Sequence, residues 1–62
     1  MQSREVLRLL KDAGWQVVRK RGSHWQLKHT SNPNIVTVPH PKSDLPIGTL
    51  KSIEKSSGVR LR

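Results

Sequence analysis

The sequence predicts an α+β domain in the order α-β-β-β-α, with a three-stranded antiparallel sheet and two helices on one face. Two stretches near the ends repeat apolar residues at helical spacing, and three stretches between them are β-branched or strictly alternating. The loops between those three stretches are short, which favours antiparallel neighbours. No repeat or linker interrupts the 62 residues, so we expect residues 1–62 to form one domain.

The first helix is predicted over residues 4–13. Ser3 is a good N-cap, and Gly14 stands where a left-handed residue commonly ends a helix. The apolar residues recur at i, i+3, i+4 and i+7, namely at Val6, Leu9, Leu10 and Ala13. The outer face of this helix carries a basic stripe, made of Arg4, Arg8 and Lys11. We interpret the stripe either as an ordinary solvated face or as a secondary contact to a phosphate backbone.

Three strands are predicted over residues 15–20, 24–29 and 35–38. The first and third are rich in β-branched residues, and the second alternates polar and apolar residues strictly. Pro39 and Pro41 then end the pairing, because neither can donate a ladder hydrogen bond.

The second helix is predicted to begin near Pro46, a residue suited to the first turn of a helix. Ile47, Leu50 and Ile53 repeat every three residues and form its apolar stripe. Gly58 is the expected left-handed residue at its end.

The faces of the first two strands can be matched through their apolar residues. A three-residue loop at 21–23 keeps those residues on one side of the sheet and places Lys20 beside His24. A two-residue loop would put Val17 and Trp25 on opposite faces. We therefore expect a core face of Trp15, Val17, Trp25 and Leu27, and an opposite face of Gln16, Val18, Lys20, His24, Gln26 and Lys28.

Composition narrows the function classes. Twelve Lys and Arg residues against four Asp and Glu residues give a net charge of +8, which favours a polyanionic partner. The absence of cysteine excludes disulfides and cysteine zinc sites. No apolar stretch is long enough to cross a membrane, and no signal peptide is evident, so we expect a cytoplasmic protein without a membrane partner.

His24 is the candidate catalytic residue. Lys20, Arg21 and Lys28 surround it in the expected sheet, and neighbouring cations disfavour the charged form of an imidazole. A neutral imidazole can accept the proton of a ribose 2′-hydroxyl, whose oxygen then attacks the adjacent phosphorus, while the cations stabilise the charge on the phosphoryl oxygens. This chemistry selects RNA over DNA. We expect no metal or other cofactor, because the histidines lack the spacing of a metal motif.

Other assignments remain open. His24 can also be an ordinary surface residue. His29 is predicted to be a structural residue at a strand end, with a hydrogen-bond partner. His40 is interpreted as a second acid/base group, a substrate contact or neither. Ser23 either caps the turn or contacts phosphate, and Gly22 is expected to adopt a positive φ.

The chain resembles the HicA (YcfA-like) toxin family in four ordered blocks. These are the Gly-Ser-His run that begins at Gly22, the Val-Thr-Val-Pro run 36–39 with His40 after it, the block 45–53, and the opening block 9–15. The resemblance covers essentially the whole chain. One departure is Trp25, where members often have a second histidine.

The resemblance implies a fold like that of a double-stranded-RNA-binding domain. It also implies an endoribonuclease toxin of a toxin–antitoxin pair, which cuts mRNA, arrests translation and is blocked by a HicB antitoxin. The matching catalytic residue is His24, and Gly22 and Ser23 match the turn that places it. Two rival interpretations are a basic RNA- or DNA-binding module without catalysis and a module that docks an acidic protein.

Overall fold

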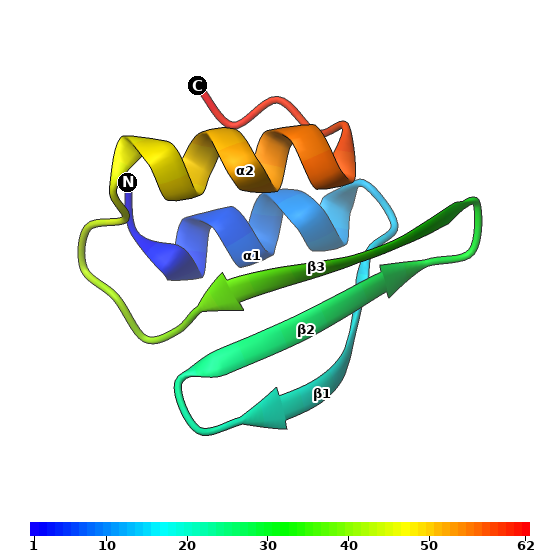
Figure 1. The fold of residues 1–62 in the computed structure, drawn as a ribbon, viewed down its shortest axis with the longest axis horizontal. Helices are drawn as coiled ribbons and strands as arrows, with labels where there is room; N and C mark the ends of the chain where they lie inside the picture. The colour runs from blue at the N-terminus through cyan, green and yellow to red at the C-terminus, as the bar shows by residue number, and fades with distance from the viewer.

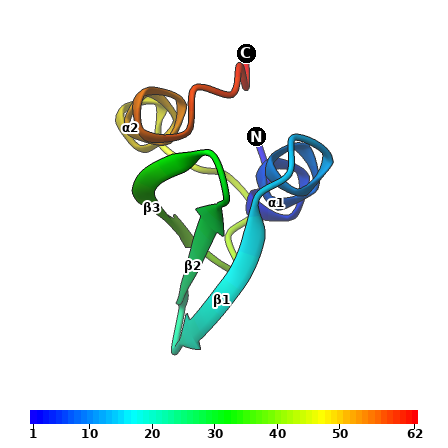
Figure 2. The ribbon, with the colours of Figure 1, turned by 90° about the vertical axis from the view of Figure 1, so that its right-hand side faces the viewer.

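The computed structural model describes residues 1–62 and has the predicted order of elements. The two helices lie on the same side of a sheet in which β2 is central and β1 and β3 form the edges (Figures 1 and 2). Both strand pairs are antiparallel. The elements are α1 (Ser3–Asp12), β1 (Gln16–Arg21), β2 (His24–His29), β3 (Asn32–Pro39) and α2 (Ile47–Ser57). Neither helix has the length and hydropathy that a membrane crossing requires.

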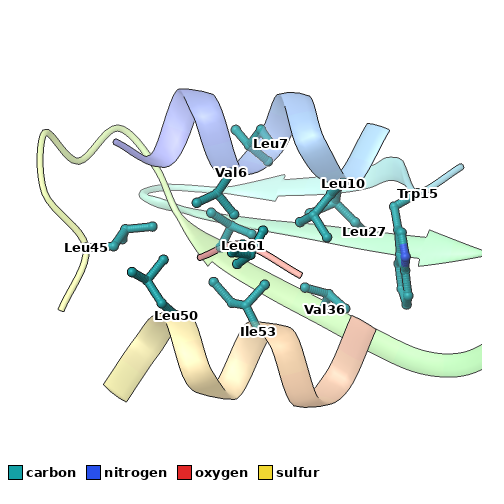
Figure 3. Packing of buried hydrophobic residues seen from close by; sticks show 11 residues of the cluster. Val6, Leu7, Leu10, Trp15, Leu27, Val36, Leu45, Leu50, Ile53 and Leu61 are labelled. Atoms are coloured by element: carbon teal, nitrogen blue, oxygen red, sulfur yellow. The ribbon is translucent and has the colours of Figure 1, made fainter. Parts of the chain in front are cut away.

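A single hydrophobic core lies between the helices and the sheet (Figure 3). Its side chains come from both helices, from the connection between α1 and β1, from β2 and β3, from the loop before α2 and from the C-terminal tail. The buried members are Val6, Leu7, Leu10, Trp15, Leu27, Val36, Val38, Leu45, Leu50, Ile53 and Leu61. All of these side chains lie on the side of the sheet that faces the helices, so no element covers the other side.

The first helix differs from the prediction at both ends. Ser3 is not its N-cap but lies in the first turn, 1% exposed, while Gln2 is the N-cap and offers no side-chain hydrogen bond. The reason is that the Ser3 hydroxyl is bonded to Lys42 instead, whose amide lies 2.8 Å from Oγ. Leu7 is buried in place of Ala13, which is exposed at the C-cap.

A β-bulge in β1 overturns the predicted hairpin. The loop has two residues, Gly22 and Ser23, so that Arg21 pairs with His24 and Lys20 pairs with Trp25. Val17 still reaches the core side opposite Leu27, because the register shifts between residues 17 and 19 and leaves Val18 without a partner. One extra residue in the strand thus places Val17, Trp25 and Leu27 on the same side of the sheet, an arrangement that was expected from the sequence to need a longer loop.

The later elements also extend or shift relative to the sequence. β3 begins at Asn32 rather than residue 35, and the turn before it shrinks to Thr30 and Ser31. In α2, Ile47 is 61% exposed, and the buried stripe consists of Leu50, Ile53 and Ser57 instead. Gly58 ends this helix with φ of +72°, as predicted.

The C-terminal tail folds back onto α2 through Glu54. The carboxylate of Glu54 accepts a hydrogen bond of 2.8 Å from the Leu61 amide and one of 3.1 Å from the Arg62 guanidinium. These contacts lower the pKa of the Glu54 carboxyl below its ordinary value, with the Leu61 bond as the largest cause. Leu61 is thereby held in the core at 6% exposure.

Candidate functional site

His24 lies on the uncovered side of the sheet, at the first position of β2. The side chains of Trp25 and Leu27 point toward the helices and pack in or against the core. Because side chains alternate along a strand, those of His24 and Gln26 point to the opposite side. The side chain is exposed, and its ring takes part in no hydrogen bond within the chain. Figure 2 shows that no helix approaches this side of the sheet. Both nitrogens of the ring are therefore available to a ligand.

The turn before His24 depends on a glycine. Gly22 has φ of +56°, and Ser23 has no positive φ. A positive φ at the first of two loop residues is the type II′ pattern, which glycine adopts without a steric cost. The Ser23 carbonyl accepts a hydrogen bond of 2.8 Å from the His40 amide, which ties the turn to the end of β3. The Ser23 side chain itself is exposed and makes no hydrogen bond within the chain.

Two arginines of β1 lie on the same, uncovered side of the sheet as His24. Arg21 is its direct register partner, and Arg19 is the partner of Gln26 one pair further along. Lys28 lies on the same side by the alternation of β2 and pairs with Gln16. We call Arg19, Arg21, His24 and Lys28 the basic face. Arg19 was missed in the sequence, although the position of Gly22 directly after Arg21 is typical of a two-residue loop and would have indicated it.

Lys20 is the predicted cation that the structure places elsewhere. It pairs with Trp25, and its ammonium lies 4.2 Å from the centroid of the Trp25 ring. Trp25 is half-buried against the core, so this contact lies on the helix side of the sheet. The expected adjacency of Lys20 and His24 is therefore wrong, because the two-residue loop reverses the side to which Lys20 points.

His40 also lies on the helix side. Its Nδ1 is 2.8 Å from the hydroxyl oxygen of buried Ser3, and its ring forms a T-shaped pair with the Trp25 ring, with 4.4 Å between the ring centroids. His24 pairs with Pro39, the residue directly before His40, but the two imidazoles belong to opposite sides. They therefore do not form an acid/base pair across one phosphate.

His29 is the structural histidine that the sequence predicts. Its Nδ1 accepts a hydrogen bond of 2.9 Å from the Ser31 amide, so the proton resides on Nε2 and is donated to the Ala13 carbonyl at 3.0 Å. The ring also packs 5.5 Å from the Trp15 ring. Both nitrogens are used, and neither is free for a substrate.

The basic stripe of α1 borders the helix side instead of the basic face. Arg4, Arg8 and Lys11 are exposed beside a hollow of about 400 Å³ that Trp25 and His40 also line. No group of three or more His, Asp or Glu side chains is gathered as the ligands of a metal ion would be.

Comparison with known proteins identifies a protein family and a similar solved structure. The family described as the HicA toxin of bacterial toxin–antitoxin systems matches residues 3–59. A solved structure described as a HicA3 and HicB3 toxin–antitoxin complex contains a chain that is 36% identical, with a TM-score of 0.86 and full coverage of both chains. No curated protein sequence matches the chain.

Proposed function

The chain belongs to the HicA toxin family, and on that premise we propose that it is an endoribonuclease of a toxin–antitoxin system, which cleaves mRNA through His24. The observation that carries this proposal is that the exposed ring of His24 lies beside Arg21 on the uncovered side of the sheet and has no hydrogen-bond partner within the chain. A general base must be free to reach the proton that it removes. Of the three histidines, only His24 has no ring nitrogen bonded within the chain.

The reaction follows from the groups on the basic face. The imidazole of His24 takes the proton of a 2′-hydroxyl, and the 2′ oxygen forms a bond to the adjacent phosphorus while the bond from phosphorus to the 5′ oxygen breaks. Arg21 and Arg19 bind the phosphoryl oxygens, on which negative charge increases in the transition state. A guanidinium can engage two of these oxygens at once. The products are a cyclic phosphate and a 5′-hydroxyl.

The leaving 5′ oxygen needs a proton. The side chains of Lys20 and His40 lie on the opposite side of the sheet from His24, so neither reaches this oxygen. We therefore assign the second proton transfer to the imidazolium of His24 itself or to water. Lys28 of the basic face and Ser23 in the adjacent turn remain available as further phosphate contacts, because both side chains are exposed.

We propose that an acidic HicB-type antitoxin neutralises the toxin by covering the basic face. The exposed apolar side chains of the sheet include Val18 at 55% and Ile35 at 53% exposure. Apolar side chains beside a strongly basic surface suit a protein partner that contributes both acidic and apolar groups. The similar solved structure is described as a toxin–antitoxin complex, which supports this partner. We place the activity in the cytoplasm, where mRNA is translated.

The test compares the wild-type chain with His24→Ala on a short RNA. We expect His24→Ala to slow cleavage about 10²- to 10⁴-fold, the usual contribution of general acid–base catalysis. Ser52→Ala, on the exposed surface of α2, is the matched control and should cleave normally. A single 2′-deoxy substitution at the cleavage site should block the reaction, and EDTA should not.

The alternative is a basic module that binds RNA or DNA without cleaving it. The basic face alone favours nucleic acid but does not require catalysis. Under this alternative, the wild-type chain and His24→Ala would both bind RNA and leave it intact. Equal cleavage by a folded His24→Ala variant would instead show that another group is the base.

A further inference from the structure

A second basic surface lies on the helix side of the sheet, next to Trp25. One hollow of about 400 Å³ runs between α1 and β2 and is lined by Arg4, Arg8, Lys11 and Trp25, among others. A neighbouring hollow of about 430 Å³ shares Lys11 and Trp25 and adds Lys20 from β1. We call these five residues the Trp25 groove. Lys11 and Trp25 line both hollows, so the two hollows lie side by side.

The ring of Trp25 is presented in an unusual way for a core tryptophan. It is half-buried, whereas Trp15 is only 3% exposed. The His40 ring packs against the Trp25 ring in a T-shaped arrangement, and the Lys20 ammonium lies over the Trp25 ring, 4.2 Å from its centroid. The face of the ring is therefore already a binding site for a flat or cationic group. A nucleobase stacks on such a face with little dependence on sequence.

The charge of the groove points to a polyanion. Four cations surround Trp25, and the single carboxylate that lines the groove, that of Asp12, is paired with Arg8 at 3.4 Å. A stacking platform flanked by cations matches a single RNA strand, whose bases meet the ring while its phosphates meet the cations. An acidic peptide would satisfy the cations but would have no general reason to stack on the ring.

The groove is adjacent to His24 along the chain. Trp25 follows His24 directly in β2, and their side chains lie on opposite sides of the sheet at the end where the hairpin turns. A strand of RNA that leaves the basic face around the Gly22–Ser23 turn reaches the groove without crossing the sheet. The three consecutive cations of β1 alternate between the two sides along this route, with Lys20 toward the groove and Arg19 and Arg21 toward His24.

We infer that the Trp25 groove is an RNA subsite that holds a nucleotide flanking the cleaved bond. The base of this nucleotide stacks on Trp25 and replaces the Lys20 ammonium, which then binds the phosphate of the same nucleotide. This inference rests on the proposed ribonuclease function. It assigns to Trp25 and Lys20 a substrate-binding role that is separate from the chemistry at His24.

The experiment measures the binding of a short RNA to the His24→Ala chain, so that cleavage does not interfere. A further Trp25→Leu change keeps an apolar side chain but removes the aromatic face. We expect it to weaken binding roughly five- to 150-fold, which corresponds to about 1–3 kcal/mol for a stacked base. Lys20→Gln should lower the slope of log affinity against log salt by about 0.7, the value for one phosphate contact on a single strand. Lys55→Gln on α2 is the matched charge control and should change neither quantity.

Fluorescence provides a second readout that does not depend on affinity. In a Trp15→Phe variant, Trp25 is the only tryptophan, and RNA should quench its emission. In the Trp25→Leu variant, Trp15 is the only tryptophan; it lines the second hollow but is only 3% exposed, so RNA should quench its emission far less than that of Trp25. If Trp25→Leu fails to fold, as judged by circular dichroism, the exposed substitutions Lys20→Gln and Lys11→Gln carry the binding test.

The outcomes separate this inference from the proposed function. If RNA is cleaved in a His24-dependent way but Trp25→Leu binds RNA within twofold of its parent, the subsite is wrong and the ribonuclease stands. If Trp25→Leu loses affinity only for an acidic antitoxin, the groove is a protein interface, which also overturns the inference. If the chain binds no RNA at all, both fail.

Discussion

The two ends of β2 carry histidines with opposite circumstances. His29, at the end of the strand, donates to Ala13, accepts from Ser31 and rests on the Trp15 ring. His24, at its start, has no bonded nitrogen and faces solvent beside Arg21. The same side chain is therefore part of the framework at one end and free for chemistry at the other. The difference lies in whether the fold already uses the hydrogen-bonding capacity of the ring.

The largest expected loss of stability comes from a change at Gly14, which packs against His29 at the hydrogen-bonded end of β2. Gly14 has φ of +97°, and a Cβ atom there would lie 2.7 Å from Nε2 of His29. Gly14→Ala should cost about 3 kcal/mol in the free energy of unfolding, because it adds backbone strain and displaces a bonded ring. Urea denaturation measures this loss, which is large for a domain stable by roughly 3–9 kcal/mol.

The matched change at the free end is Gly22→Ala. Gly22 also has a positive φ, of +56°, but a Cβ atom there would meet nothing within 4 Å. We expect a loss of about 1 kcal/mol from backbone strain alone. Equal losses for the two alanine variants would contradict the claim that His29 is locked in place.

Exchanging the two histidines for alanine is the next largest test. His29→Ala should lower the free energy of unfolding by about 2 kcal/mol, because two hydrogen bonds and a ring contact are lost. Cleavage per folded molecule should stay near wild type. His24→Ala should change stability by less than about 0.5 kcal/mol, as surface substitutions usually do. A nuclease defect in well-folded His29→Ala would reverse the assignment of the two ends.

Arg21→Gln sharpens the description of the free end. Its guanidinium is the cation paired with His24, so its loss should slow RNA cleavage about tenfold, equivalent to about 1.4 kcal/mol in the barrier. Cleavage kinetics at saturating RNA separate this effect from weaker binding. Lys55→Gln, which removes one charge on α2, is the control, and an equal effect of both changes would mean that only net charge matters.

The smallest expected effect on stability concerns Glu54, a carboxylate whose hydrogen bonds, like those of His29, are already used within the fold. Its pKa is lowered in the folded chain, chiefly by the Leu61 amide. A depressed folded pKa means that this contact contributes stability above the unfolded pKa and loses it as the pH falls through the folded value. Glu54→Gln should therefore destabilise the chain slightly at pH 7, and this difference in stability should shrink as the pH falls through the folded pKa of Glu54. Thermal melting across this range, with Glu5→Gln as control, checks the sign.

The sequence was sufficient for the order of the elements, for the exposed position of His24 and for the structural role of His29. These follow from local periodicity, which is set within a few residues. The sequence did not predict on which side of the sheet Lys20 lies. Val17 and Val18 are both apolar, so the pattern does not indicate that a bulge at this point reverses the side to which the following residues of β1 point. Ser3 was misjudged for a different reason, since its partners His40 and Lys42 are distant in sequence.

The position of β1 at the edge of the sheet has a consequence for the chain at high concentration. An open edge strand offers unpaired backbone groups that can template the growth of fibrils. Arg19, Lys20 and Arg21 are consecutive on this edge, and like charges on an approaching copy would repel them. The residues that attract a polyanion thus also keep identical chains apart, so that overproduction should yield monodisperse protein rather than β-rich aggregates.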